Sequence, residues 1–464
     1  MNGYREKISN YINEKKGEIV SDLKELIKIP SVSSGAYCEK VLLRIKEMYE
    51  KNGFETEYDR EGGYLLSYFG KSEHSLGLFA HADVVGVSDD WTLGAPFEAL
   101  EKDGAIIGRG TLDDKSGVIM SLYCMKLFKE LDIPFNSRLV CFTGSNEENG
   151  MEDIQSYVKT HTPPTFSLVP DSAFPLYHGN KGIVWIGVSS DAPFELITGF
   201  CGGRSVNITL GDVTVRLKYS DALYDELKKD TSVQAERDKD EIVLRAKGIS
   251  THGALPEGSL NAGLVAIRAI LSCPSFCSVK DRKILEYLTH LLSNYYGEAL
   301  GIENYDTDFG RLTCTNGIIK MQDGKIYLTF DIRVGASVDI DAMSSKICSE
   351  LSDRAMSVTI IRSDEAHFVS KDDPYIQKCL DVYRKYSGNK DAQAIINAGG
   401  TYARYLPCSA EIGTQYAQKK IFSLPKGHGG LHQPDEYISI DAFLRAIELC
   451  ALMLIECDGE GRDE

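Results

Sequence analysis

The stretch over residues 76–118 constrains the fold and the chemistry of this chain more than any other. It opens with an apolar run, residues 76–80, which predicts a buried strand ending at His81-Ala-Asp83. Because side chains two positions apart in a strand point the same way, His81 and Asp83 can face one direction from the end of this strand. A histidine and a carboxylate placed together at a strand end indicate a candidate metal or catalytic site.

The same stretch ends in a glycine-rich turn, GRGTLDDKSG, which leads into an apolar helix pattern that begins at Val118. The turn contributes two more acids, Asp113 and Asp114. Histidine and carboxylate together favour a divalent cation such as Zn²⁺, with Mn²⁺ or Co²⁺ as alternatives. A lone His-x-Asp pair is more often structural or solvated, so this interpretation depends on acids further along the chain.

Two further predicted strands also end in acids. The apolar strand over residues 138–144 runs into Glu147-Glu148, and the strand over residues 166–169 runs into Asp171. Adjacent carboxylates repel each other unless cations or separate roles offset the repulsion. One glutamate as a metal ligand and the other as a general base is such an arrangement, although a pair standing alone would be read as an exposed acidic loop.

The order of the predicted elements divides the chain of 464 residues into two domains. Strands alternate with helices up to about residue 181, and this pattern returns near residue 369. Between them lie short strands, a helix and a hairpin-like segment. We therefore predict an α/β catalytic domain with a mixed sheet flanked by helices, formed by residues 1–181 and 369–464, and an inserted α+β lid domain, residues 182–368. The site is expected at the carboxyl ends of the strands.

The net charge, the apolar segments and the cysteines of the chain limit which partners and which cellular location can be expected. The net charge of −17 argues against nucleic acid or an anionic membrane surface. The apolar run over residues 449–455 is too short to span a bilayer, and the charged N-terminal segment lacks the apolar core of a signal peptide. The twelve cysteines are scattered, which is typical of reduced thiols. A cytoplasmic location is therefore expected.

These motifs together resemble those of a known enzyme family. The resemblance rests on HAD, GRGTLDDK, Glu147-Glu148, Asp171 and the late His432. In this order and spacing they are similar to the di-zinc metallopeptidase family of aminoacylases, carnosinases and carboxypeptidase G-type enzymes, over nearly the whole chain. The phrases PDSAFPL and GGTYAR resemble the branch of bacterial carnosinase-like dipeptidases in particular.

The resemblance implies a centre of two metal ions, zinc first, with manganese or cobalt as alternatives. The implied ligands are His81, Asp113, Glu148, Asp171 and His432. Asp113 would bridge both ions, and a cis peptide bond between Asp113 and Asp114 is typical of the family. Asp83 would hold the second ring nitrogen of His81, and Glu147 would be the general base. Apart from His252, the other six histidines, His428 among them, are expected to be structural.

The resemblance also implies residues that bind the substrate. His252, in the inserted domain, would donate to the oxyanion, while Asn207 and Arg333 would hold the substrate. Gly400 and Thr401 would line the substrate pocket. The length of the inserted domain implies a monomer, with a homodimer as the alternative.

The implied function is the hydrolysis of dipeptides by a hydroxide bound to two metal ions, with Glu147 as the base. The first alternative is an amidohydrolase acting on N-acyl amino acids, of the aminoacylase or desuccinylase type. The second is a non-catalytic metal-binding protein that keeps the fold. The presence of every ligand and of the base argues against the second alternative.

Overall fold

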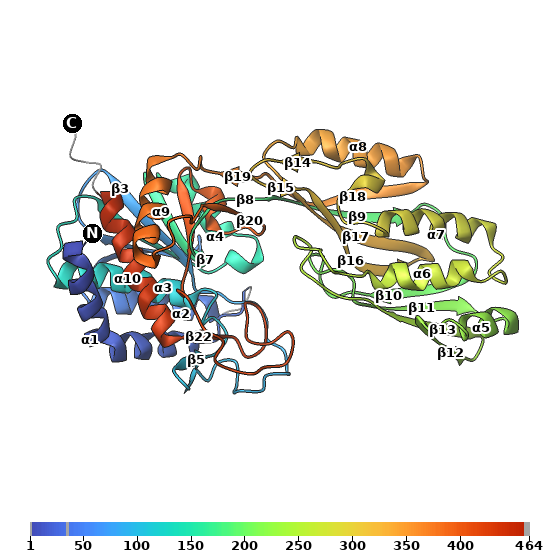
Figure 1. Ribbon diagram of the computed structural model, residues 1–464, viewed down its shortest axis with the longest axis horizontal. Helices are drawn as coiled ribbons and strands as arrows, with labels where there is room; N and C mark the ends of the chain where they lie inside the picture. The colour runs from blue at the N-terminus through green and yellow to red at the C-terminus, as the bar shows by residue number, and fades with distance from the viewer. Residues whose placement is uncertain (1, 34–36, 459–464) are drawn as a thin grey trace. The chain divides into compact units, whose positions relative to one another are not determined.

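The computed structural model describes residues 2–33 and 37–458 (Figure 1). The chain divides into two compact units. The first consists of Met1–Asn180 and Phe368–Glu464, and the second is the continuous segment Lys181–His367. Both units mix helices with sheets, so the predicted α/β class with mixed sheets is confirmed.

The first unit is built on a nine-stranded mixed sheet of order β1-β2-β6-β3-β7-β21-β8-β19, with β20 paired to β8. Its strands are β1 (Glu55–Asp59), β2 (Tyr64–Phe69), β3 (Ser75–His81), β6 (Arg138–Gly144), β7 (Phe166–Ser172), β8 (Tyr177–Asn180), β19 (His367–Phe368), β20 (Ile395–Asn397) and β21 (Ser409–Gly413). The four central strands β6, β3, β7 and β21 are parallel, so their carboxyl ends share one edge. A three-stranded sheet, β22-β5-β4, adds Tyr437–Ser439, Ala105–Ile107 and Leu100–Lys102.

Two apolar cores cover the two faces of the central sheet. Alternate residues of β3 point to opposite faces, so Leu78 joins one core and Phe79 the other. The larger core contains α1 (Asn2–Ile27), α2 (Tyr37–Lys51), α3 (Lys115–Glu130), α9 (Pro374–Ser387) and α10 (Ile440–Cys457). The smaller core contains α4 (Glu152–Thr160) and the 3₁₀ helix η3 (Tyr402–Tyr405). The central strands are thereby buried on both sides, which fixes the position of their ends.

The second unit is an eight-stranded antiparallel sheet of order β12-β13-β11-β10-β16-β17-β9-β18. Its strands are β9 (Gly182–Ser190), β10 (Ile197–Gly202), β11 (Asp212–Lys218), β12 (Val233–Asp238), β13 (Glu241–Lys247), β16 (Thr313–Gln322), β17 (Lys325–Val334) and β18 (Met356–Asp364). The short strands β14 (Tyr305–Asp306) and β15 (Gly310–Arg311) pair separately. The helices are α5 (Asp221–Leu227), α6 (Ala262–Ser272), α7 (Val279–Leu292) and α8 (Ile340–Ser352), with the 3₁₀ helix η2 (Glu298–Leu300). They pack on the sheet through one shared apolar core, and α6 and α7 can be followed along it in Figure 1.

Side-chain caps set several helix boundaries. The carboxylate of Asp114 accepts a hydrogen bond from the backbone N–H of Gly117, 3.1 Å away, and starts α3 directly after the glycine-rich turn. Ser439 caps the start of α10, where its hydroxyl accepts a hydrogen bond from the backbone N–H of Ala442. Among the described residues, no helix combines the length and the apolar character needed to cross a membrane. The twelve cysteines, all within the described ranges, form no disulfide.

Candidate metal centre

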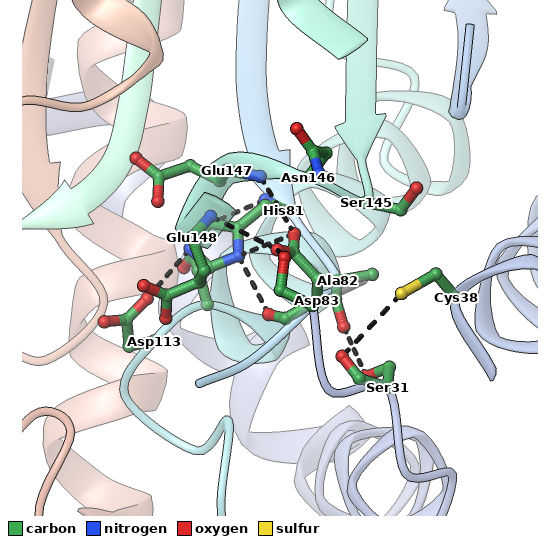
Figure 2. Close-up of polar contacts among 12 residues, drawn as sticks. Ser31, Cys38, His81, Ala82, Asp83, Asp113, Ser145, Asn146, Glu147 and Glu148 are labelled. Carbon is green, nitrogen blue, oxygen red and sulfur yellow. Dashed lines mark hydrogen bonds and ion pairs between the residues drawn. The ribbon is translucent and has the colours of Figure 1, made fainter. Parts of the chain in front are cut away.

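His81 lies at the carboxyl end of β3, fully buried, where it meets carboxylates from two other segments (Figure 2). Its Nε2 atom lies 2.8 Å from Oδ1 of Asp113 and 3.8 Å from Oδ2 of Asp171. Asp171 belongs to β7, the neighbouring parallel strand, whereas Asp113 comes from the glycine-rich turn before α3. Strand ends and turn thus place the predicted residues together, as expected for a site at the edge of a parallel sheet.

The sequence predicted that the carboxylate of Asp83 holds the second ring nitrogen of His81, but in the structure the backbone carbonyl of Asp83 is the nearer group. The backbone carbonyl of Asp83 lies 2.9 Å from Nδ1 of His81, and its carboxylate is at 3.4 Å. The carboxylate instead accepts hydrogen bonds from the backbone N–H groups of Glu147 and Glu148, each 3.2 Å long, and from the hydroxyl of Ser33. Asp83 therefore orients both the imidazole and the loop that carries the glutamate pair.

Asp113 faces two histidines with its two oxygens. Oδ1 lies near His81, and Oδ2 lies 2.9 Å from Nε2 of His432. The same Nε2 atom of His432 lies 3.3 Å from Oε2 of Glu148. The peptide bond between Asp113 and Asp114 is cis, which confirms that expectation. Each carboxylate oxygen of Asp113 therefore faces a different imidazole.

The potential ligand atoms form two overlapping groups. One combines His81, Asp113 and Glu148, and the other combines His81, Glu147 and Asp171; within each group the atoms lie within 4.8 Å of one another. Glu147, assigned from the sequence as a base, therefore lies as close to His81 and Asp171 as a ligand would. This geometry is compatible with either role for Glu147, and a Glu147→Gln variant separates the two.

The protonation of the centre reflects its burial. Burial, followed by the negative charge of Asp171, raises the pKa of Glu147 well above its usual range. Burial and the charge of Asp113 raise the pKa of Asp171 to about 6. The side chain of His432 is 54% exposed; its partial desolvation lowers the pKa, but hydrogen bonds with Asp113 and Glu148 outweigh this effect and raise the pKa to about 11. The raised pKa values show that the clustered carboxylates favour bound protons, which reduce their mutual repulsion. A bound cation would offset the same negative charge.

The donor set fits a divalent cation. Two imidazoles and several carboxylates are the ligands that zinc and its neighbours prefer. Oε1 of Glu148 is buried and has no hydrogen-bond partner among the described residues. A buried carboxylate oxygen without a donor carries a desolvation penalty that a cation would remove.

We expect metal uptake to release protons, and to release more of them at pH 6 than at pH 8. His432 is protonated at both values, whereas Asp171, with a pKa of about 6, holds a proton only near the lower one. As the pH rises fewer protons compete, so the affinity for metal must rise with pH. Calorimetric titration of chelator-stripped protein in buffers of different ionisation enthalpy counts the protons released. A count of zero at both pH values would contradict this assignment.

Glu436 supports the centre from behind and was missed in the sequence. It is fully buried and accepts hydrogen bonds from Arg109 Nη1 at 2.5 Å, from the backbone N–H of Leu112 at 2.8 Å and from that of Gly110 at 3.1 Å. These partners belong to the turn that ends in Asp113. Since Glu436 follows His432 by four residues, it ties the segments of two proposed ligands together.

A Glu436→Gln substitution should destabilise the protein by about 3–5 kcal/mol, because the buried guanidinium of Arg109 loses its counter-charge. Metal affinity should also fall, by roughly 10–100-fold, as expected for residues that orient ligands. Denaturant unfolding and metal titration measure the two effects. The control is Glu101→Gln, which breaks the exposed pair with Lys24 and should change stability by no more than about 1 kcal/mol. Equal stability of the two variants would contradict the role of Glu436.

The loop of Gly400 and Thr401 is held by a second carboxylate that was missed in the sequence. Glu411, fully buried in β21, accepts hydrogen bonds from Thr401 Oγ1 at 2.9 Å, Asn397 Nδ2 at 2.6 Å and Asn180 Nδ2 at 2.5 Å. The hydroxyl of Thr401 is thus engaged within the protein. Glu411 occupies an apolar strand pattern, which gave no signal of this role.

The candidate residues of the second unit also lie near one another. The N–H of Gly253, next to His252, donates to the carbonyl oxygen of Asn207 at 2.7 Å. A Cβ atom at Gly253 would lie 2.8 Å from Asp331, whose carboxylate accepts hydrogen bonds from Nε of Arg333 at 2.8 and 3.1 Å. Arg333 is buried, 3% exposed, whereas His252 is exposed. The fold of this unit therefore gathers all three predicted residues.

Comparison with known proteins agrees with this geometry. The model of peptidase family M20/M25/M40 matches residues 77–456, and the chain belongs to this family. The family is metal-dependent, and the resemblance found in the sequence is thereby confirmed at the level of the family.

Individual relatives extend over almost the whole chain. A protein of Staphylococcus epidermidis named "Putative dipeptidase" is 26% identical, covering 96% of this chain and 97% of its own length. One from Staphylococcus aureus strain USA300, with the same designation, is 27% identical over 94% of this chain and 95% of its own. Human carnosine dipeptidase 1 has a TM-score of 0.62 at 15% identity, covering 98% of this chain and 99% of its own. The dipeptidase Dug1p of Saccharomyces cerevisiae has a TM-score of 0.59 at 14% identity and covers 99% of each chain. These structural likenesses show a shared fold.

Proposed function

We propose that this chain is a metal-dependent dipeptidase. The observation that carries the proposal is the placement of Asp113 between His81 and His432, with the Glu147-Glu148 pair beside them. Membership of a metal-dependent peptidase family and relatives named as dipeptidases support the same reaction. A dipeptide is accordingly the proposed substrate.

The proposed metal ligands are five residues of the first unit: His81, Asp113, Glu148, Asp171 and His432. Two divalent cations are proposed, zinc first, with manganese or cobalt as alternatives. When bound, such ions polarise the scissile carbonyl and lower the pKa of a water molecule toward neutrality. Asp113 is the proposed bridge because each of its oxygens faces a different histidine.

Glu147 is the proposed general base. It is buried, 8% exposed, and its backbone is held by the Asp83 carboxylate, so its side chain starts from a fixed position. It would take a proton from the attacking water as the C–O bond forms. It would then return that proton to the amine nitrogen as the C–N bond breaks. One carboxylate would therefore both remove the proton from water and deliver it to the leaving amine.

The proposed substrate residues are Asn207, His252 and Arg333 of the second unit, with the backbone of Gly400 and Thr401 of the first. The imidazole of His252 can donate to a developing oxyanion, and a guanidinium suits a peptide carboxylate. The segment Lys181–His367, which forms the second unit, is the proposed lid domain. Loss of kcat in a His252→Ala variant would support this role.

The experiment that tests the function measures amino-acid release from dipeptides, tripeptides and N-acyl amino acids. Chelator-stripped protein is assayed alone and with Zn²⁺, Mn²⁺ or Co²⁺ added. Metal-restored cleavage confined to dipeptides supports the proposal. Cleavage of N-acyl amino acids alone would replace it with an amidohydrolase. Metal binding without turnover on any substrate would indicate a binding protein on the same fold.

A further inference from the structure

We infer that Asp153 and Tyr402 form a positioning pair that fixes the loop carrying Glu147 and Glu148. The inference rests on the proposed function, because it assigns to that loop the general base and a metal ligand. Asp153 belongs to none of the motifs that indicated the site, and Tyr402, although it lies within GGTYAR, had no role assigned to it from the sequence. Both are buried, each 1% exposed, and they lie 249 positions apart in the chain.

Asp153 is the anchor of the loop. Its Oδ2 atom accepts three hydrogen bonds: from the backbone N–H of Ser145 at 2.7 Å, from that of Asn146 at 2.8 Å and from the hydroxyl of Tyr402 at 2.5 Å. Oδ1 accepts a fourth from the N–H of Ile154 at 2.8 Å. Hydrogen bonds to an ionised acceptor are the stronger kind, so this single carboxylate holds the loop firmly.

Asp153 and Asp83 divide the loop between them. The N–H groups of the first two residues, Ser145 and Asn146, donate to Asp153, and those of the next two, Glu147 and Glu148, donate to Asp83 (Figure 2 shows the second pair). Four consecutive backbone donors are therefore fixed by two buried carboxylates. A shift at either anchor must move the base and the ligand that the loop presents.

Gly144 provides the space that the pair occupies. This residue ends β6, directly before the loop. A Cβ atom built on it would lie 1.9 Å from the Tyr402 hydroxyl oxygen and 2.3 Å from Oδ2 of Asp153. Such distances are far inside van der Waals contact, so any side chain here would displace the hydroxyl or the carboxylate. The glycine is required by the close approach of these two groups to the backbone.

Tyr402 connects the loop to two other parts of the centre. Its ring meets the imidazole of His81 edge to face, with centroids 6.3 Å apart and planes at 86°. It also follows Thr401 directly and so belongs to the segment proposed to line the substrate pocket. Its hydroxyl thereby links that segment to the loop of the base. Small displacements at a catalytic group can lower the rate by roughly 10²-fold, so this link should be visible in kinetics.

The test compares two tyrosines that flank the same phenylalanine. Tyr402→Phe removes only the hydroxyl bound to Asp153. Tyr64→Phe removes a hydroxyl that faces Thr160, 3.4 Å away, from a ring stacked on Phe142. Both rings lie in one aromatic cluster, so the control reproduces the loss of a buried hydroxyl without touching the loop. Asp153→Asn is the second test variant, because it keeps the shape and removes the charge.

Two readouts are measured: kcat and KM on a dipeptide, and the Co²⁺ affinity of chelator-stripped protein from its visible absorption. For Tyr402→Phe we expect kcat to fall about 10-fold with KM changed less than about 2-fold, and the Co²⁺ affinity to fall about 10-fold. Asp153→Asn should show larger changes in the same direction. Tyr64→Phe should stay within about 2-fold of the wild type in both readouts.

Kinetics of Tyr402→Phe equal to those of Tyr64→Phe would overturn the inference. A lowered melting temperature with unchanged kcat and Co²⁺ affinity would also overturn it, since the pair would then serve stability alone. The Co²⁺ titration separates this failure from that of the proposed function. A wild type that cleaves no dipeptide, but whose Co²⁺ affinity falls on Tyr402→Phe, would refute the dipeptidase proposal and retain the positioning pair.

Discussion

A Glu147→Gln variant should keep its metal ions and lose its turnover. The amide has nearly the shape of the carboxylate but cannot accept the proton of the attacking water. General-base catalysis typically contributes 10²–10⁴-fold, so kcat should fall by about that factor. The measurement is dipeptide hydrolysis at saturating substrate, with Co²⁺ titration of the same stripped preparation. Near wild-type turnover would remove Glu147 from the role of base.

The matched control is Glu148→Gln, the same change one position along the loop. Oε2 of Glu148 lies 3.3 Å from Nε2 of His432, so this variant should bind Co²⁺ more weakly. The opposite assignment is also testable, because the Glu147 carboxylate groups with His81 and Asp171. If Glu147 were a ligand, both variants would lose metal affinity to a similar degree. Comparing the Co²⁺ affinities of the two variants therefore shows whether Glu147 acts as a base or as a metal ligand.

The sequence contained enough information to predict the central part of the fold. The strand into His81, the strand before Glu147 and the helix after the glycine-rich turn all form as predicted, in β3, β6 and α3. Each is an apolar segment with a clear boundary, so local pattern and burial agree. Because the parallel strands share one edge, residues at their ends meet, which explains why motifs far apart in the chain could be combined into one centre.

Other elements gave no clear local signal. The hairpin of β1 and β2 and the helices α7 and α8 were not identified. Exposed faces dilute the apolar pattern of β1, α7 and α8, whereas β2 is mostly buried and was missed despite its apolar sequence. Strand β7 also runs further than predicted, to Ser172, which places Asp171 inside the strand. Tertiary pairing extends such strands beyond the apolar residues that mark them.

The supporting acids could not be found from the sequence because their partners are distant. Glu436 pairs with Arg109 across 327 positions, and Glu411 with Asn180 across 231. An isolated acid in a sequence is read as solvated, since buried charges are rare unless paired. Only the folded chain shows that each of these carboxylates has its donors. Residues that hold a site in place are therefore harder to predict than residues that perform its chemistry.

Replacing Asp113 by asparagine should abolish tight metal binding, whereas the same change at Asp114 should be nearly silent. Burial would raise the pKa of Asp113, but hydrogen bonds with His432 and His81 hold it well below its usual range, so a full charge faces both imidazoles. An amide cannot supply that charge to two cations. The loss of Co²⁺ affinity should exceed the roughly 10–100-fold typical of residues that merely orient ligands.

Asp114 tests the assignment because it is the adjacent residue, is also an aspartate and is fully buried. Burial, then the charge of Asp171, raises the pKa of Asp114 well above the usual range, which favours its uncharged form. Asparagine caps helices as well as aspartate does, so it can keep the bond from the N–H of Gly117 that starts α3. It gives up only the longer hydrogen bond, 3.3 Å, that the second carboxylate oxygen accepts from the backbone N–H of His81. Asp114→Asn should therefore keep Co²⁺ affinity within about 3-fold and stability within about 1 kcal/mol. If both variants lost metal equally, the bridge could not be assigned to Asp113, and the two carboxylates would have to share the cations.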